Sequence, residues 1–231
     1  MTTGVDVWAG VRERVLALSE APHRDKVFGA HEHAFEPADV LTGHQVADIE
    51  ARLGIRLPDE YRTFLLEVGA SGAGPAYGLL RPDPEREPWR TGTEPPVVDQ
   101  DFADRLGAHS DVEPYDGAPG APADERERRA AYETWEREYD PLAEQLAAGT
   151  LCLNHQGCGY FTLLVLNGPR RGTLWDDLRA ADEGIVPLQG AQASFAGWYL
   201  AWLRDAERYA WGDERREQPA PDRAHPRKNA S

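Results

Sequence analysis

The sequence predicts an α+β domain in which helices flank a mainly antiparallel sheet, with a long insert rich in proline and acidic residues. Residues 41–69 hold two short segments whose apolar residues recur at helical spacing. Residues 150–175 hold three β-rich apolar runs separated by turn clusters, and an amphipathic helix follows them at 194–203. Neighbouring short strands with helices before and after them are typical of the α+β class.

A short amphipathic helix is predicted at the front of the chain, over residues 5–20. The apolar residues at helical spacing there are Val7 or Trp8, Val11, Val15 and Leu18. A loop over residues 22–39 follows. Its apolar side chains predict that it packs against the domain, and they are Val27, Phe28 and Phe35.

The next two predicted helices carry clear end signals. Thr42 and Gln45 form a capping-box pattern at the start of the first helix, and Gly54 stands where a left-handed residue would end it. Pro58 fits the first turn of the second helix, and Gly69 is predicted to end it.

The insert is predicted over residues 81–146, after a strand that opens at Leu79 and Leu80. Many prolines and acids fill its first half, where the isolated apolar anchors are Trp89, Val97, Val98, Phe102 and Leu106. A helix is predicted over 124–139, with Tyr132, Trp135 and Tyr139 on one side. Pro141 is expected to break or kink it.

The sheet is predicted as an antiparallel meander. Its strands cover residues 150–153, 160–166 and 172–175, and its turns cover 154–159 and 167–171. Ser194 caps a last helix whose broad apolar stripe must bury against that sheet. The stripe consists of Phe195, Trp198, Tyr199, Trp202 and Leu203.

The charge balance excludes one function class and favours another. The chain has 25 Lys and Arg against 40 Asp and Glu, which gives a formal net charge of −15. Such a chain would repel phosphates, so sequence-independent nucleic-acid binding is excluded, whereas basic partners are favoured. Residues 94–150 alone hold 15 acids and five bases. This segment is either an acidic face for a basic partner or a solvated insert kept soluble by its charge.

The cytoplasm is the predicted compartment. The first 18 residues lack the apolar core of a signal peptide, and no later window has the run of about 18 apolar residues that a membrane span needs. The only cysteines are Cys152 and Cys158, and two cysteines in a chain of this size do not indicate a secreted disulfide scaffold.

No metal site, cofactor site or catalytic motif is predicted. His31 and His33 lie near Glu32 and Glu36, but no further ligands can be named. A second candidate group consists of Cys152, His155 and Cys158. As a metal site it lacks a second pair of ligands, and as a catalytic Cys–His pair it lacks a carboxylate that would orient the histidine. A buried free Cys152 and a Cys158 in a turn are the simpler interpretation.

Three further residues have two interpretations each. Asp176 and Asp177 follow Trp175 at a strand end, where they are either half of an acid/base site or two solvated carboxylates. Trp89 either plugs the edge of the core or is an exposed anchor of a binding interface.

Several blocks of the chain, taken in order, resemble the SUKH superfamily, the Smi/Knr group named for a yeast cell-wall-synthesis regulator. The blocks cover residues 41–69, 157–161, 167–176 and 194–203. The positions that match as fold determinants are Leu57, Pro58, Tyr61, Phe64, Gly69, Gly157, Gly159, Trp175, Ser194 and Phe195. The resemblance implies a curved, largely antiparallel sheet flanked by helices. The implied division is an N-terminal helix and linker (1–26), a SUKH-like domain (27–205, insert 81–146) and a disordered polar tail (206–231).

The resemblance also implies a non-enzymatic function. Bacterial members of the superfamily are interpreted as immunity proteins that bind and neutralise toxins, many of them nucleases, and eukaryotic members act as regulatory scaffolds. The expected partner is therefore a basic toxin domain, with a regulatory scaffold for endogenous partners as the alternative. Acidic and aromatic residues are the candidate contacts, namely Trp89, Asp111, Glu113, Tyr115, Asp116, Trp135, Asp176 and Asp177.

Overall fold

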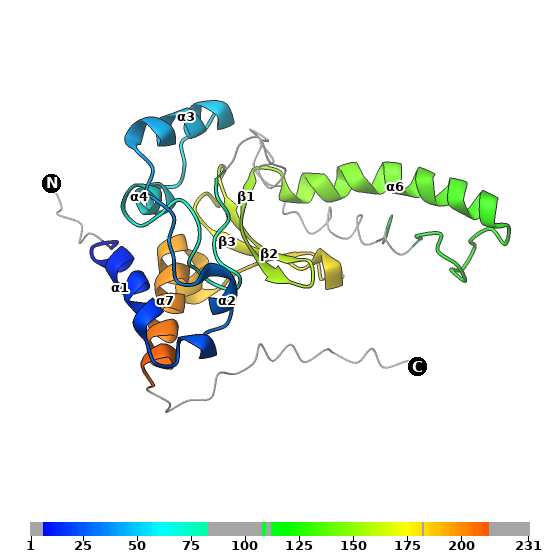
Figure 1. Ribbon diagram of the computed structural model, residues 1–231. Helices are drawn as coiled ribbons and strands as arrows, with labels where there is room; N and C mark the ends of the chain where they lie inside the picture. Colours follow the sequence, from blue (N-terminus) through cyan, green and yellow to red (C-terminus); the bar gives the residue numbers. More distant parts are fainter. Residues whose placement is uncertain (1–6, 83–107, 110–111, 182, 213–231) are drawn as a thin grey trace.

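Helices pack on a four-stranded antiparallel sheet, and one long helix extends away from both (Figure 1). The computed structural model describes residues 7–82, 108–109, 112–181 and 183–212. Within these residues the strands are β1 (Thr150–Gly157), β2 (Tyr160–Val165), β3 (Leu174–Asp177) and β4 (Ile185–Pro187), in that spatial order. Each strand pairs antiparallel with the next, which confirms the α+β class and the meander.

Two strands differ from the sequence prediction. Strand β1 continues through residues 154–156, which were predicted as a turn, because Asn154 pairs with Thr162 and His155 with Phe161, with a register shift on each side of this pair of residues. The actual turn is tight, and Gly157 and Gly159 take left-handed φ angles of 96° and 79° there. Strand β4 was not predicted.

The strand predicted at Leu79 and Leu80 is reduced to single contacts. Leu79 forms isolated bridges with Gly72 and with Asn154 of β1, and the Leu80 amide donates to the Leu153 carbonyl at 2.8 Å. These residues therefore cover part of the outer edge of β1 without forming a strand.

The N-terminal half of the chain is helical. The helices are α1 (Val11–Ala17), α2 (Ala30–His33), α3 (Gly43–Leu53) and α4 (Asp59–Glu67), with 3₁₀ turns η1 (Leu18–Glu20) and η2 (Arg24–Lys26). The first helix is shorter than predicted, and it is Trp8 rather than Val7 that is buried before it, with 2% against 42% exposure.

The end signals of α3 were predicted correctly, whereas Pro58 is the N-cap of α4 and not part of its first turn. At the start of α3, the Gln45 amide donates to Thr42 Oγ1 at 3.2 Å and the Thr42 amide donates to Gln45 Oε1 at 2.8 Å, which confirms the capping box. Gly69 does follow α4, but for a different reason. A Cβ there would lie 2.8 Å from the Ala38 carbonyl oxygen, so glycine allows the loop to approach.

The C-terminal half holds the two longest helices. The sequence predicted a break or a kink at Pro141; helix α6 (Glu125–Ala147) continues through this residue, so it does not break there. A proline removes one hydrogen bond of the ladder, and the turns on either side still continue the helix. The short turns η3 (Arg179–Ala181) and η4 (Gly190–Ala193) precede α7 (Phe195–Trp211), where Ser194 Oγ accepts from the Gly197 amide at 3.2 Å.

One main core joins the helices to the sheet. Buried side chains of α1, α3, α4 and α7 form a single cluster with residues from three strands, Leu151, Leu153, Leu164 and Leu174. Four rings stand at its centre, Trp8, Phe64, Phe195 and Tyr199, with centroids 4.7–6.2 Å apart. A smaller cluster of Ala147, Cys152, Leu163, Val165 and Trp175 is separate from it.

The N-terminal residues belong to this main core, since Trp8, Val11, Val15 and Leu18 lie in the same cluster as Phe195. Helix α7 runs on to Trp211, so residues 206–211, predicted as tail, are helical. The rest of the predicted tail, 213–231, lies outside the described residues. No helix within the described part of the chain is long and apolar enough to cross a bilayer.

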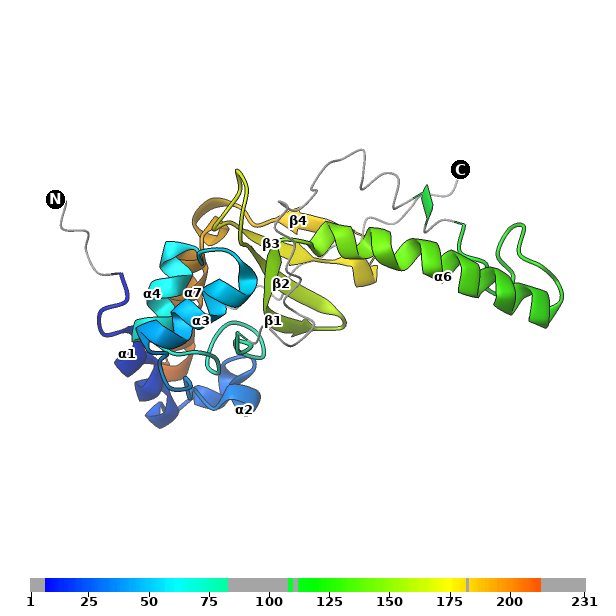
Figure 2. The same cartoon turned by 90° about the horizontal axis from the view of Figure 1, so that it is seen from above.

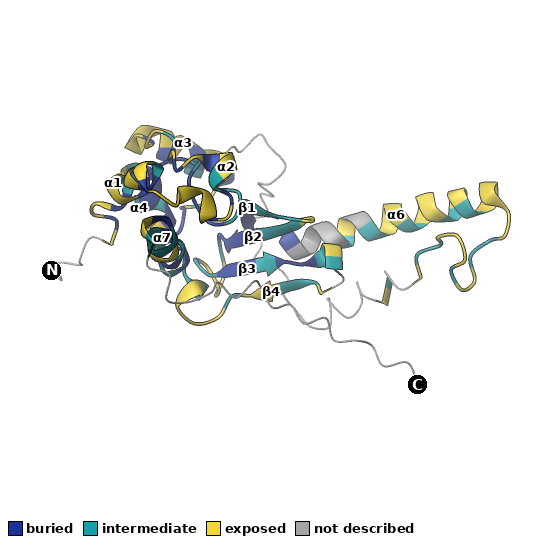
Figure 3. Ribbon diagram, turned by 60° about the horizontal axis from the view of Figure 1, so that its bottom comes forward, coloured by how far each residue is buried: buried dark blue, intermediate teal, exposed yellow. Residues whose placement is uncertain are grey.

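Helix α6 differs from all of these elements in its surroundings. Two views at right angles both show it projecting away from the sheet and from the other helices (Figures 1 and 2). With 23 residues it is about 34 Å long, at about 1.5 Å per residue. Coloured by burial, its described residues are exposed or intermediate until Ala147 at its end (Figure 3).

Candidate protein-binding surface

The candidate contact residues fall in two separate places. Glu113, Tyr115, Asp116 and Trp135 lie on or beside α6, whereas Asp176 and Asp177 lie on β3. Trp89 and Asp111 lie outside the described residues. We call residues 108–109 and 112–139 the arm, and its part before α6, residues 108–109 and 112–124, the strap.

The strap is attached to α6 at two points. Near one end, Trp135 Nε1 donates to the His109 carbonyl at 2.9 Å, and His109 Nε2 lies 3.4 Å from the Trp135 carbonyl oxygen. Near the other end, Arg128 Nη1 lies 3.5 Å from Asp116 Oδ1 and donates to the Pro122 carbonyl at 3.2 Å. Because 109 lies against 135 and 116 against 128, the strap runs antiparallel to the helix.

Aromatic rings complete the first attachment. The His109 ring is stacked on Trp135, with centroids 5.9 Å apart and planes 4° apart, and Trp135 is stacked on Tyr139 at 4.7 Å. Trp135 is half-buried by these contacts. It therefore holds the arm together, while the exposed aromatic side chains of the arm are Tyr115 at 57% and Tyr132 at 37%.

Acid is unevenly distributed over the arm. Residues 125–139 of α6 are nearly balanced, with five Glu and four Arg: Glu125, Arg126, Glu127, Arg128, Arg129, Glu133, Glu136, Arg137 and Glu138. One such pair, Arg129 and Glu133, lies 3.4 Å apart. The strap has three acids, Glu113, Asp116 and Asp124, and no Lys or Arg. The surplus negative charge of the described arm is thus greatest on the strap.

One strap acid also starts the helix. Asp124 Oδ1 accepts from the Arg126 and Glu127 amides, each at 3.0 Å, as an N-cap does. Glu113 has no such role, and Asp116 stays 89% exposed although it pairs with Arg128, so both charges remain at the surface.

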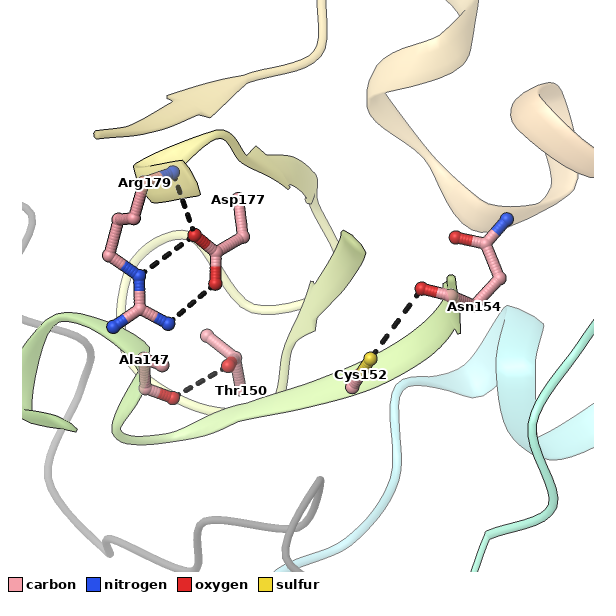
Figure 4. A network of polar contacts seen from close by, with 6 residues as sticks. All are labelled: Ala147, Thr150, Cys152, Asn154, Asp177 and Arg179. Atoms are coloured by element: carbon pink, nitrogen blue, oxygen red, sulfur yellow. Dashed lines mark hydrogen bonds and ion pairs between the residues drawn. The ribbon is translucent and has the colours of Figure 1, made fainter. Parts of the chain in front are cut away.

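Asp176 and Asp177 are not two solvated carboxylates. Asp176 Oδ1 accepts from Gln156 Nε2 at 2.6 Å, within a polar group that includes Thr162. Asp177 is 5% exposed and forms a bidentate ion pair with Arg179, whose Nε donates to Asp177 Oδ1 at 2.8 Å (Figure 4). This hydrogen bond and the Asp177 charge raise the pKa of Arg179. Asp177 is therefore occupied inside the fold, and we leave it out of the surface.

The two cysteines have different environments, as the simpler interpretation predicted. Cys152 is buried and free, and burial, followed by the nearby Asp177 charge, raises the pKa of its thiol to about 12. Its Sγ donates to the Asn154 carbonyl at 3.6 Å (Figure 4). Cys158 is exposed at the tip of the β1–β2 turn. His155 between them stacks on Tyr77 at 5.9 Å.

The two histidines considered as metal ligands also separate. His33 is buried, its Nδ1 accepts from the Phe35 amide at 3.1 Å, and burial lowers its pKa to about 4. His31 is exposed, 3.6 Å from Glu32. Across the residues that the structure describes, no group of three or more His, Cys, Asp or Glu could hold a metal ion.

The residues predicted as fold determinants lie in the core or at the ends of elements. Leu57, Tyr61, Phe64, Trp175 and Phe195 are 0–3% exposed. The others end or begin an element or form a turn, and they are Pro58, Gly69, Gly157, Gly159 and Ser194.

Two residues of the arm were missed as candidate contacts. Val112 is 65% exposed between Asp111 and Glu113, and Tyr132 was placed only on the apolar side of the helix. Val112 was hard to recognise as a contact residue, because a single valine flanked by acids in a proline-rich segment has no apolar neighbours in the sequence. Its exposure depends on how the strap lies on α6.

An open antiparallel sheet packed with helices, from which an acidic arm projects, defines an α+β domain that presents a charged surface clear of its core. Residues 41–186 match the SMI1 / KNR4 family (SUKH-1), and the chain belongs to this family. The matched region includes residues 81–146, which were predicted as an insert, and ends before α7. Neither the curated proteins nor the solved structures gave a match.

Proposed function

We propose that this chain is a protein-binding module of immunity type, which neutralises a basic toxin by occluding it in the cytoplasm and catalyses no reaction. Family membership fits either an immunity role or a regulatory role. In both roles the partner is another protein. The observation that carries the proposal is the arm, because it presents surplus acid on a surface that the core does not use.

The charge of the arm fits a basic partner. Between residues 112 and 139 there are eight acids and four bases. An acidic surface attracts a basic protein over about a Debye length, roughly 8–10 Å at physiological salt, and this raises the association rate. A toxin that grips phosphate groups, such as a nuclease, would present such a basic surface at its active site, so that binding there would block its substrate.

One candidate nucleophile, Cys152, and one candidate metal ligand, His33, are used in packing, which supports a non-catalytic role. The Cys152 thiol is buried and its raised pKa keeps it protonated, which makes it a poor nucleophile. The imidazole of His33 is buried in contact with Phe35 and Trp202. Both side chains are used in packing.

Co-expression with the product of the neighbouring gene tests the proposal. The chain should restore growth and co-purify with that protein, and the association rate should fall as salt is raised. A Glu113→Gln/Asp116→Asn variant should associate several-fold more slowly, because two strap charges are lost. The control Asp25→Asn/Glu32→Gln makes the same charge change at exposed carboxylates of η2 and α2, outside the arm.

Failure to restore growth and to co-purify would contradict toxin neutralisation. Binding of a protein that is not toxic, without any growth phenotype, would favour the regulatory alternative. Equal slowing by the strap variant and by the control would show that net charge, rather than the arm, guides association.

A further inference from the structure

We propose that three exposed side chains of the arm, Val112, Tyr115 and Tyr132, form the docking platform for the partner, and that the partner offers an apolar pocket bordered by Lys and Arg. This inference rests on the proposed function and names the contact that it uses. It goes beyond charge attraction, because charge sets the approach of two proteins while buried apolar and aromatic groups hold them together.

The strap geometry brings these residues together. Val112 and Tyr115 lie between the two attachment points, which join His109 to Trp135 and Asp116 to Arg128. The stretch of helix between the same two points is 128–135, and it contains Tyr132. Strap and helix therefore present the three side chains on one part of the arm, next to the Trp135 stack that fixes its register.

The platform is more exposed than folding alone requires. Val112 is 65%, Tyr115 57% and Tyr132 37% exposed, and none of them belongs to either buried cluster. Isolated exposed apolar residues are ordinary, but here a valine and two tyrosines occur within one short stretch of a projecting segment. Tyrosine supplies large contact area at a low entropy cost, which is why it is frequent among residues that dominate binding.

The charges around the platform determine which partner fits. Glu113 lies between Val112 and Tyr115 in the sequence, and Asp116 follows Tyr115 directly. The Asp116 side chain is 89% exposed although it lies 3.5 Å from Arg128, which is only 21% exposed. An exposed pair of this kind is weak, so Asp116 can meet a cation of the partner as well. An apolar centre with an acidic border matches an apolar pocket with a basic border.

A second exposed aromatic surface serves as the matched control. Phe28 is 54% exposed, close to the 57% of Tyr115, but it lies on the helical side of the domain and packs on Tyr77 at 5.2 Å. No acidic side chain is adjacent to it in sequence. Phe28→Ala therefore removes an equally exposed ring away from the arm.

The experiment compares Tyr115→Ala, Val112→Ser and Phe28→Ala for binding to the product of the neighbouring gene. We expect Tyr115→Ala to weaken binding by about tenfold or more, mainly through faster dissociation, and Val112→Ser to weaken it several-fold. Phe28→Ala should bind as the original chain does. The Tyr115 carbonyl accepts from the Ala118 amide, and the backbone bond survives the substitution, so circular dichroism should show an unchanged helix content.

The outcomes separate this inference from the proposed function. If the original chain binds and Tyr115→Ala binds equally well, the platform is wrong while toxin neutralisation stands. If Phe28→Ala loses binding instead, the contact lies on the helical side of the domain. If the original chain neither binds nor restores growth, the proposed function fails, and the platform fails with it.

Discussion

The core and the arm use the same kinds of side chain in opposite ways. In the core, the rings of Phe64 and Tyr199 lie 4.7 Å apart, and each is at most 1% exposed. In the arm, the rings of Trp135 and Tyr139 also lie 4.7 Å apart, yet both are only half-buried. Ring distance alone does not distinguish a core from a surface stack. The stabilisation depends on the apolar area removed from water, which is far larger in the core.

Charged side chains also have different partners in the two regions. Around the core, the half-buried Arg12 donates through Nη1 to the Ala38 carbonyl at 2.8 Å, and the exposed Arg171 donates through Nη2 to the Leu57 carbonyl at 2.6 Å, so the guanidinium groups satisfy carbonyls of distant segments. In the arm, Arg129 and Glu133 pair along one exposed helix face. Removing a core charge disturbs two segments, whereas removing an arm charge changes little except the surface potential.

The largest expected effect is in the core. Phe64→Ala should lower the free energy of unfolding by about 3–5 kcal/mol, because it leaves a cavity among Trp8, Phe195 and Tyr199. Urea denaturation measures this value. Phe28→Ala deletes the same side chain at 54% exposure and should cost less than about 1 kcal/mol. Similar losses in both variants would mean that Phe64 is not part of a closely packed core.

An intermediate effect is expected from pH, and it also arises in the core. The pKa of His33 is lowered to about 4 by burial, whereas an unfolded histidine titrates near 6.5. The unfolded chain therefore binds a proton that the folded chain does not, and stability falls as pH drops from about 6.5 towards 4. At pH 5 the loss from this group is about 2 kcal/mol.

His33→Asn isolates this contribution. The Asn oxygen takes the place of Nδ1, which accepts from the Phe35 amide, but it does not titrate. Unfolding free energies measured between pH 7 and pH 5 should fall by about 2 kcal/mol less in the variant than in the original chain. Parallel pH curves for the two proteins would exclude His33 as the cause of acid sensitivity.

The elements that sequence alone predicted are those with local signals. The ends of α3 depend on Thr42, Gln45 and Gly54, all within one short segment, and Ser194 caps α7 by contact with Gly197 three residues later. Helical spacing of apolar residues likewise identified α4 and α7. These features need no knowledge of the rest of the chain.

The elements that sequence missed depend on distant partners. Strand β1 continues over polar residues because Asn154 bonds to both Pro75, 79 residues away, and Thr162 of β2. Strand β4 has three residues and ends in proline, so it has no readable periodicity, and it forms by pairing with β3.

The binding surface was likewise predicted only where it depends on local sequence and not on distant partners. Glu113, Tyr115 and Asp116 were recognised from the acidic composition of the insert. The internal role of Trp135 was not, because it depends on His109, 26 residues earlier. The burial of Asp177 depends on its ion pair with Arg179, and neither residue type indicates burial by itself.

The smallest expected effect separates the arm from the core. Trp135→Ala removes the ring on which His109 and Tyr139 stack and the Nε1 donor to the His109 carbonyl. Because Trp135 and Tyr139 belong neither to the main core cluster nor to the residues packed against it, global unfolding should change by less than about 0.5 kcal/mol. Amide hydrogen exchange should become about tenfold faster in residues 125–139, whereas residues 160–165 of β2 and 195–211 of α7 should exchange as before. Faster exchange in β2 and α7 as well would show that arm and core unfold as one unit. Tyr132→Ala removes a ring 5.6 Å from Trp135 but keeps the His109 hydrogen bond, so it should speed exchange in residues 125–139 by less than Trp135→Ala does.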